Sequence, residues 1–217
     1  MKGLLVTFEG QDGSGKSTLL RLVETSAREK GLTIVAVSEF SDRVIGKFLQ
    51  ETLTQNKFLR LNDSGPSALT ETMYVLSDLY SQDEFEIVPA LRQGAVVIKE
   101  RHVDSIVACQ LPKIAADYPQ SDAERMFRWL QQACGQLTQP GLTVFLRVSD
   151  EKLKDRIEGR GEQVAESDLA VFKERQVIYD RLAIENQHPW LEVVNDAEPQ
   201  AVVEIVVNEM MRRLAAR

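Results

Sequence analysis

Short apolar runs alternate along the chain with longer segments in which apolar residues recur every three or four positions. The short runs are rich in β-branched residues, which predicts buried strands, and they cover residues 4–8, 33–37, 95–98, 142–148 and 190–194. The longer segments have helical spacing and cover residues 17–30, 45–53, 68–91, 103–116, 123–137, 150–159, 167–183 and 199–214. Strands that alternate with helices predict an α/β fold in which helices cover both faces of a parallel, five-stranded sheet.

Pro112 falls inside one of these helical segments. Proline lacks a backbone N–H and its ring clashes with the preceding turn, so we expect the helix to be interrupted or to end there. The chain of 217 residues shows no internal repeat and is short enough for one core. We therefore predict a single domain over residues 1–217.

Composition and charge exclude several classes of protein. No stretch approaches the roughly 18 apolar residues that would span a bilayer, and residues 1–3 lead directly into the first strand, without the features of a signal peptide. These observations predict a soluble, cytoplasmic protein without a membrane partner. A net charge of −7 argues against general binding to nucleic acid, which needs a basic surface. Cys109 and Cys134 lack neighbours at metal-ligand spacing, so we expect buried free thiols.

The strongest local signal follows the first strand. The segment Gly10-Gln11-Asp12-Gly13-Ser14-Gly15-Lys16-Ser17 matches the pattern G-x-x-x-x-G-K-[ST], with a strand before it and a helix after it. In that context backbone N–H groups and the amino end of the helix bind phosphate oxygens, Lys16 reaches the β- and γ-phosphates, and Ser17 ligates Mg²⁺. The motif predicts a P-loop NTPase three-layer fold that binds ATP and Mg²⁺ through residues 10–18, Thr18 included.

A second candidate site follows the third strand, at Glu100 and Arg101. Ligands of open α/β sheets bind beyond the carboxyl ends of the strands. An arginine there can hold a phosphate through two hydrogen bonds, and a carboxylate can position water bound to Mg²⁺ or accept a proton from the attacking oxygen. We therefore expect both residues to act in catalysis.

Two segments resemble thymidylate kinases. Residues 8–18 read F-E-G-Q-D-G-S-G-K-S-T, similar to the family's opening pattern F-E-G-x-D-G-x-G-K-[ST]-T, and residues 100–110 read E-R-H-V-D-S-I-V-A-C-Q, similar to D-R-Y-x-x-S-x-x-A-Y-Q. The resemblance runs from residue 4 to about residue 215. It implies a homodimer that transfers a phosphoryl group from ATP to dTMP or a related monophosphate.

The resemblance also implies roles for individual residues. Asp12 would face the sugar of the acceptor, Arg101 would contact the acceptor, and Glu100 would hold Mg²⁺ through water. Residues 156–168 would form the short mobile lid, in which Arg156 and Arg160 are four residues apart and would share one helical face. The implied acceptor site comprises Asp12, Glu39, Arg43, Val75, Leu79, Arg101, Ser105, Cys109 and Gln110.

The chain departs from the family pattern mainly on the acceptor side. Ser38 replaces the phosphate-binding arginine after the second strand, with Arg43 as the nearest substitute. Leu79 stands where an arginine reads the base, Val75 where a phenylalanine stacks on thymine, and Cys109 where a tyrosine crowds a ribose 2′-hydroxyl. The pattern therefore predicts kinase chemistry but leaves the acceptor base and sugar open.

Three other functions stay open. Deoxynucleoside kinases also carry a glutamate after the second strand, and in this alternative Glu39 is the general base for a nucleoside 5′-hydroxyl. A nucleotide-dependent switch protein would have a magnesium-binding aspartate at a strand end and no arginine lid, and a simple binding module would transfer no phosphoryl group. The mechanism that we expect is in-line transfer, in which the spread charge is stabilised by Lys16, Mg²⁺, Arg101, Arg156 and Arg160.

Overall fold

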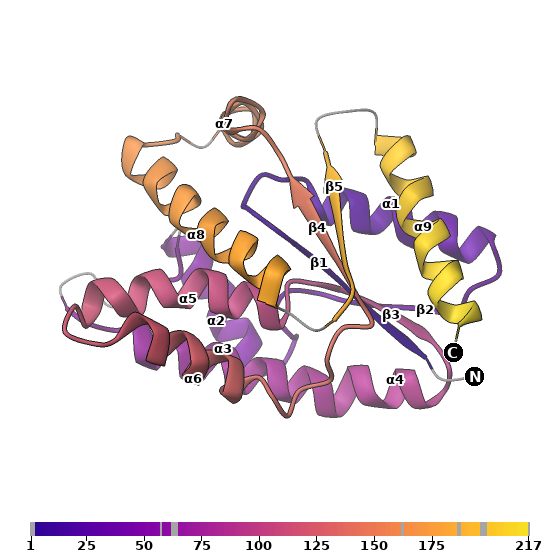
Figure 1. Ribbon diagram of the computed structural model, residues 1–217, viewed down its shortest axis with the longest axis horizontal. Coiled ribbons are helices and arrows are strands. Elements are labelled where there is room, and N and C mark those ends of the chain that lie inside the picture. Colours follow the sequence, from indigo (N-terminus) through magenta and orange to yellow (C-terminus); the bar gives the residue numbers. More distant parts are fainter. Residues whose placement is uncertain are drawn as a thin grey trace.

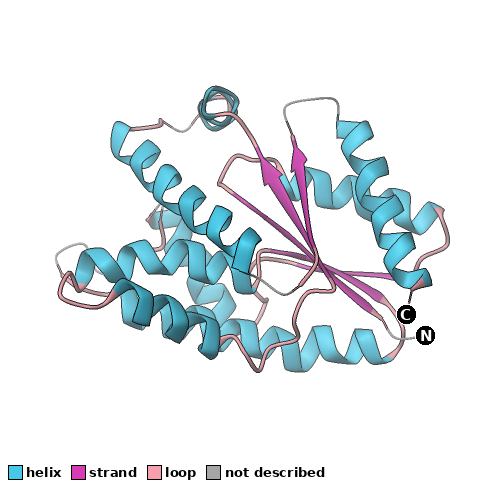
Figure 2. Ribbon diagram, in the orientation of Figure 1, coloured by secondary structure: helices cyan, strands magenta, loops and turns pink. Residues whose placement is uncertain are grey.

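The computed structural model describes residues 3–56, 58–61, 65–161, 163–185, 188–195 and 199–216. Its centre is a parallel five-stranded sheet in the order β2-β3-β1-β4-β5 (Figures 1 and 2). The strands are β1 (Leu4–Gly10), β2 (Ile34–Val37), β3 (Val96–Glu100), β4 (Leu142–Arg147) and β5 (Trp190–Val194). The predicted α/β fold is therefore confirmed.

Helices cover both faces of this sheet. They are α1 (Lys16–Glu29), α2 (Val44–Gln55), α3 (Ala68–Gln82), the π-helical turn η1 (Asp83–Ile87), α4 (Val88–Arg92), α5 (Val103–Asp117), α6 (Ala123–Ala133), α7 (Asp150–Glu158), α8 (Glu166–Glu185) and α9 (Pro199–Ala215). The apolar sides of α1 and α9 pack on one face of the sheet, whereas α3, α5, α6 and α8 form the second layer (Figure 1).

Strand β1 determines where the site lies. It pairs with β3 on one side and β4 on the other, and all its residues are buried, as its uniformly apolar start predicts. Because the sheet is parallel, the carboxyl ends of β1, β3 and β4 meet at one edge. The loop after β1 and the residues after β3 therefore lie close together.

Two helical segments differ from expectation. Helix α5 continues through Pro112, so the predicted interruption is wrong. The buried side chains of Ile106, Leu111 and Ile114 hold α5 in the second layer, and tertiary packing outweighs one lost backbone hydrogen bond. The helix expected over 68–91 is present but divided, because residues Asp83–Ile87 widen into one π-helical turn.

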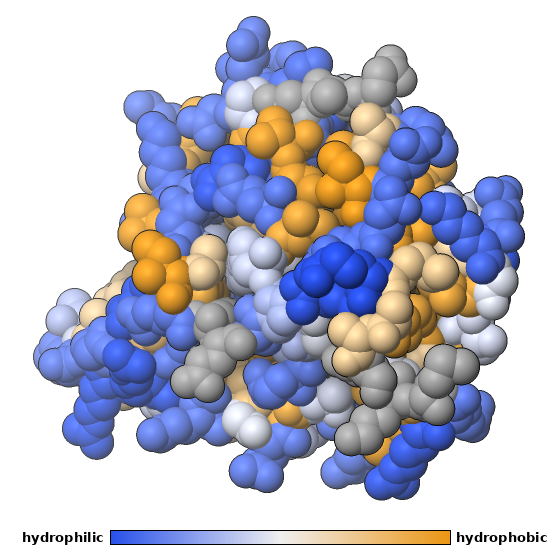
Figure 3. Space-filling model, turned by 45° about the vertical axis from the view of Figure 1, so that its right-hand side comes forward, coloured by the Kyte–Doolittle hydropathy of each residue, from blue (hydrophilic) through white to orange (hydrophobic). Residues whose placement is uncertain are grey.

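On the face shown in Figure 3, hydrophilic side chains surround several separate patches of hydrophobic ones. Within the described ranges, the structure holds no helix that is both long and apolar enough to span a membrane. Both cysteines are free thiols. Cys134 is buried as expected, whereas Cys109 is only partly buried.

Candidate active site

The phosphate loop between β1 and α1 depends on glycine. Gly10, Gly13 and Gly15 have φ angles of 141°, 81° and 92°, which side chains disfavour. A Cβ atom on Gly13 would lie 2.8 Å from Ile157 Cγ1, and one on Gly15 would lie 2.7 Å from Asn195 Nδ2. The loop is therefore closely covered by α7 and by the residue after β5.

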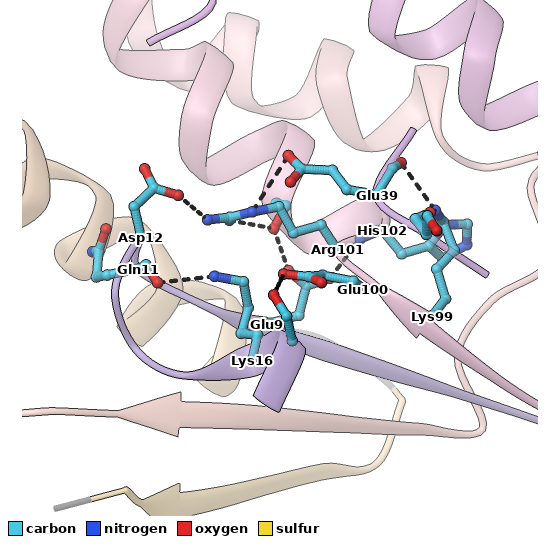
Figure 4. Close-up of polar contacts among 12 residues, drawn as sticks. Glu9, Gln11, Asp12, Lys16, Glu39, Lys99, Glu100, Arg101 and His102 are labelled. Carbon is cyan, nitrogen blue, oxygen red and sulfur yellow. Dashed lines mark hydrogen bonds and ion pairs between the residues drawn. The ribbon is translucent and has the colours of Figure 1, made fainter. Parts of the chain in front are cut away.

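Lys16 and Ser17 begin the helix that follows the loop. The Lys16 ammonium donates to the carbonyl oxygen of Gln11 at 2.9 Å (Figure 4). Burial, followed by the charge of Arg101, lowers the pKa of Lys16 to about 8. The Ser17 hydroxyl donates to Glu100 Oε1 at 2.9 Å. The two candidate motifs are thus in direct contact.

Arg101 is the centre of the polar network in Figure 4. Its φ of 54° is unusual for a residue other than glycine, and such strained conformations cluster at functional sites. Its Nη2 atom contacts Asp12, its Nε atom lies 3.4 Å from Glu39, and Nη1 donates to Ser105 and Tyr179 at 3.1 and 3.4 Å. Each nitrogen of this guanidinium therefore has a protein partner.

Asp12 has a second cationic partner, which lies outside the sequence motifs. The Arg175 side chain on α8 reaches Asp12 Oδ2 at 3.0 Å. Partial burial would raise the pKa of Asp12, but the charges of Arg101 and Arg175 hold it well below its usual range. Gln11 also donates to the carbonyl oxygen of Phe172 at 2.8 Å. Helix α8 is therefore tied to the phosphate loop at two points.

A sequence signal for Arg175 does exist. The buried positions of α8 are Asp168, Phe172, Arg175, Tyr179 and Leu182, which follow helical spacing. A charged residue at a buried position of a helix indicates an ionic partner elsewhere in the fold, because a buried charge needs one. Arg175 belongs to none of the motifs described above.

A cavity of about 770 Å³ adjoins the phosphate loop. Its lining includes these expected acceptor residues: Asp12, Glu39, Val75, Leu79, Arg101, Ser105, Cys109 and Gln110. Arg43 does not belong to the lining, because its guanidinium lies exposed over the Phe85 ring, 4.4 Å from the centroid. Lys113, Phe58 and Arg175 line the cavity although sequence reasoning did not select them.

The loop after β2 is anchored beneath the cavity. Lys99 is buried in β3, and its ammonium donates to the carbonyl oxygens of Ser38 at 2.9 Å and of Glu39 at 3.3 Å (Figure 4). The backbone N–H of Ser41 donates to Asp78 Oδ2 at 2.9 Å. Burial raises the pKa of Glu39, and the charge of Arg101 opposes this shift. The loop therefore holds the Glu39 carboxyl beside Arg101.

Behind Arg101 lies a buried pair, Glu9 and His102. Glu9 accepts from the backbone N–H of His102 at 2.8 Å and from the Ser105 hydroxyl. Burial, together with the charge of Asp104, raises the pKa of Glu9 to about 7. Burial, together with the charge of Lys99, lowers the pKa of His102 to about 4. His102 is therefore neutral at physiological pH.

The two arginines expected in the lid are separated. Helix α7 ends at Glu158, so Arg160 lies in the following turn, and the expected shared helical face is wrong. Arg156 donates to the carbonyl oxygens of Ser14 at 3.0 Å and Asn195 at 2.6 Å. Arg160 is exposed and lines the cavity. Residue 162 of the expected lid lies outside the described residues.

The chemistry of the loop fits Mg²⁺. Ser17 and Glu100 offer oxygen atoms, which this ion prefers, and nucleotide phosphates usually supply further ligands. In the part of the chain that the structure describes, His, Cys, Asp and Glu form no group of three or more that could hold a metal ion by themselves. A site completed by substrate phosphates agrees with this arrangement.

The fold and the site together define a class of protein. A glycine-rich loop leads from the central strand of a parallel sheet into a helix, and a cavity with a buried arginine adjoins it. The chain is a P-loop nucleotide kinase. The family model for thymidylate kinase matches residues 8–209, and the chain belongs to this family.

Similar proteins agree with this assignment. A probable thymidylate kinase of Caldivirga maquilingensis is 26% identical over 96% of this chain and 91% of its own length. Thymidylate kinases of an Exiguobacterium species and of Cutibacterium acnes are 30% and 31% identical over 75% of this chain, and over 71% and 78% of their own lengths. The resemblance inferred from the motifs is confirmed, and the deoxynucleoside kinase and switch-protein alternatives are not favoured.

Proposed function

We propose that the protein transfers the γ-phosphoryl group of ATP to the phosphate of dTMP or a closely related nucleoside monophosphate. The observation that carries this proposal is the cavity that adjoins the phosphate loop, shares Asp12 and Gly13 with it, and is also lined by Arg101, which contacts Asp12. An acceptor in this cavity would lie next to the phosphate loop at Asp12 and Gly13. The names of the related thymidylate kinases support dTMP as the first candidate.

The donor side binds ATP through the phosphate loop. Backbone N–H groups of residues 10–18 and the amino end of α1 surround the phosphates, and Lys16 contacts the β- and γ-phosphates. The Ser17 hydroxyl would hold Mg²⁺ directly, and Glu100 would hold one of its water ligands. When bound, this ion neutralises phosphate charge. Little covalent chemistry remains for the protein, so these residues act by positioning and by charge.

The acceptor side combines an apolar wall with polar ends. Phe40, Leu59, Val75, Leu79 and Ile106 line the cavity and suit the faces of a planar base. Arg101 and Arg160 supply positive charge for the transferred group, and Arg156, beside Ser14, does so from the loop side. The base-reading arginine of the family pattern is absent at Leu79, so the acceptor range remains part of the proposal.

Two further proposals concern the setting of the reaction. We place the reaction in the cytoplasm, where ATP and nucleoside monophosphates are available. We also propose a homodimer formed through the α2–α3 face, which we define by Val44, Phe48, Met73 and Tyr74. These side chains are 86%, 40%, 53% and 39% exposed, and such apolar clusters mark interaction surfaces.

The decisive test is to follow ADP release from Mg-ATP with a panel of nucleosides and nucleoside monophosphates, both ribo and deoxy. We expect turnover with dTMP or another pyrimidine monophosphate. The rate of ADP release should fall by at least about a hundredfold in K16M, because this substitution removes the lysine charge at the transferred phosphate. L22A, on the exposed side of α1, is the matched control and should keep full activity. Turnover of unphosphorylated nucleosides alone would refute the proposal and return Glu39 to the role of general base.

A further inference from the structure

Arg175 lines the cavity and has a hydrogen-bonding edge that no described residue uses fully. Its Nη1 atom is bonded to Asp12 Oδ2 at 3.0 Å. Its Nε atom is buried, and no described residue accepts a hydrogen bond from it. The side chain is 6% exposed and lines the cavity. A buried N–H group without an acceptor is unfavourable, which indicates that a ligand supplies one.

The geometry of the unused edge favours a phosphate. A guanidinium binds phosphate most strongly through two adjacent N–H groups. Since Nη1 is held by Asp12, the edge formed by Nε and Nη2 remains available. The guanidinium carbon also lies 5.1 Å from the centroid of the Phe58 ring, which helps to fix the plane of the group. Arg175 is therefore already oriented before an acceptor binds.

The other arginines near the cavity are less suited to this task. Arg101 has protein partners at each of its three nitrogens, among them Asp12, Glu39 and Ser105. Arg160 is exposed, and Arg43 stacks on Phe85 outside the cavity lining.

We propose that Arg175 binds the phosphate group of the acceptor nucleotide through its Nε–Nη2 edge. This inference rests on the proposed function, because it requires an acceptor that is already a monophosphate. Asp12 holds Arg101 and Arg175 from opposite oxygens of one carboxylate, so the position of the Arg175 guanidinium is fixed before the acceptor phosphate binds.

The test compares the binding of dTMP and thymidine, which differ only by the phosphate. Dissociation constants are measured by calorimetry for the wild type, R175Q, R175K and R181Q. We expect R175Q to weaken dTMP binding by about tenfold or more, and R175K by about fivefold or more, since lysine keeps the charge but lacks the paired N–H groups. Thymidine and ATP binding should stay within about twofold of the wild type. R181Q is the matched control on α8, because Arg181 pairs with Glu124 and Glu185 away from the cavity.

The outcomes separate this inference from the proposed function. A wild type that binds thymidine but no monophosphate contradicts the proposed function before any variant is compared. If the wild type binds dTMP and R175Q weakens dTMP and thymidine equally, Arg175 shapes the cavity and the inference is wrong. Unchanged dTMP affinity in R175K also overturns it, and this variant decides the question if R175Q does not fold.

Discussion

At the scale of single residues, the burial of Lys16 has a measurable consequence. Its ammonium is charged only below its pKa, which is about 8. Since the charged form binds phosphate, ATP affinity should fall as the pH rises through this value, by up to about tenfold per pH unit. Calorimetric titrations with ATP between pH 7 and pH 9.5 measure the effect.

K16R is the control for this titration, because an arginine stays charged over the whole range. Its ATP affinity should change little with pH, whatever its absolute value. A wild type whose dissociation constant for ATP stays constant up to pH 9.5 would show that Lys16 keeps its proton in the free protein.

Residues in local motifs could be predicted from the sequence, whereas residues joined by the fold could not. Gly10 to Ser17 form one continuous pattern, and their place between a strand and a helix follows from it. Arg175 reaches Asp12 across 163 positions of the chain, and no local spacing encodes that contact. Arg43 was expected at the acceptor by order alone, but the aromatic ring of Phe85 holds it elsewhere.

At the scale of elements, α2 approaches the loop after β2 through a glycine. A Cβ atom on Gly46 would lie 2.1 Å from the carbonyl oxygen of Ser41, closer than any packing allows. We expect G46A to destabilise the protein by about 2 kcal/mol or more, because the helix must move away. It should also raise the KM for the acceptor, since Glu39 and Phe40 in this loop line the cavity.

Thermal unfolding and steady-state kinetics measure both effects. K47A, at the next and exposed position of α2, is the matched control and should change neither quantity appreciably. Normal stability of G46A would mean that α2 is not held against this loop in solution.

Element types could be predicted because the apolar periodicity records burial, but element boundaries depend on tertiary contacts. Strand β1 and helix α1 agree closely with their patterns. Pro112 carries a strong local preference against helix, but the packing of α5 against α3, α6 and α8 overrides this preference. The π-helical turn at Asp83–Ile87 has no signature in the periodicity, so a continuous helix was the natural expectation.

At the scale of the whole molecule, the α2–α3 face leads to a prediction about assembly. The double variant F48E/M73E places two charges among exposed apolar side chains, which disfavours burial of this face against a second copy. We expect a dimeric wild type and a monomeric variant in size-exclusion chromatography with light scattering.

I205E serves as the comparison for this experiment, because Ile205 is also exposed, at 51%, but lies on α9 in the other helical layer. It should remain dimeric. A wild type that is monomeric at micromolar concentration would contradict the proposed dimer without affecting the assignment of the active site.

The order of the strands also bears on how the chain is made. β1 is the central strand, yet its neighbours β3 and β4 begin only at Val96 and Leu142. Ribosomes add about 5–20 residues per second, so the edge of β1 next to β4 stays unpaired for on the order of ten seconds. Unpaired strand edges promote aggregation. The central position of β1, which carries the phosphate loop, therefore also leaves the nascent chain with an unpaired strand edge until β4 has been synthesised.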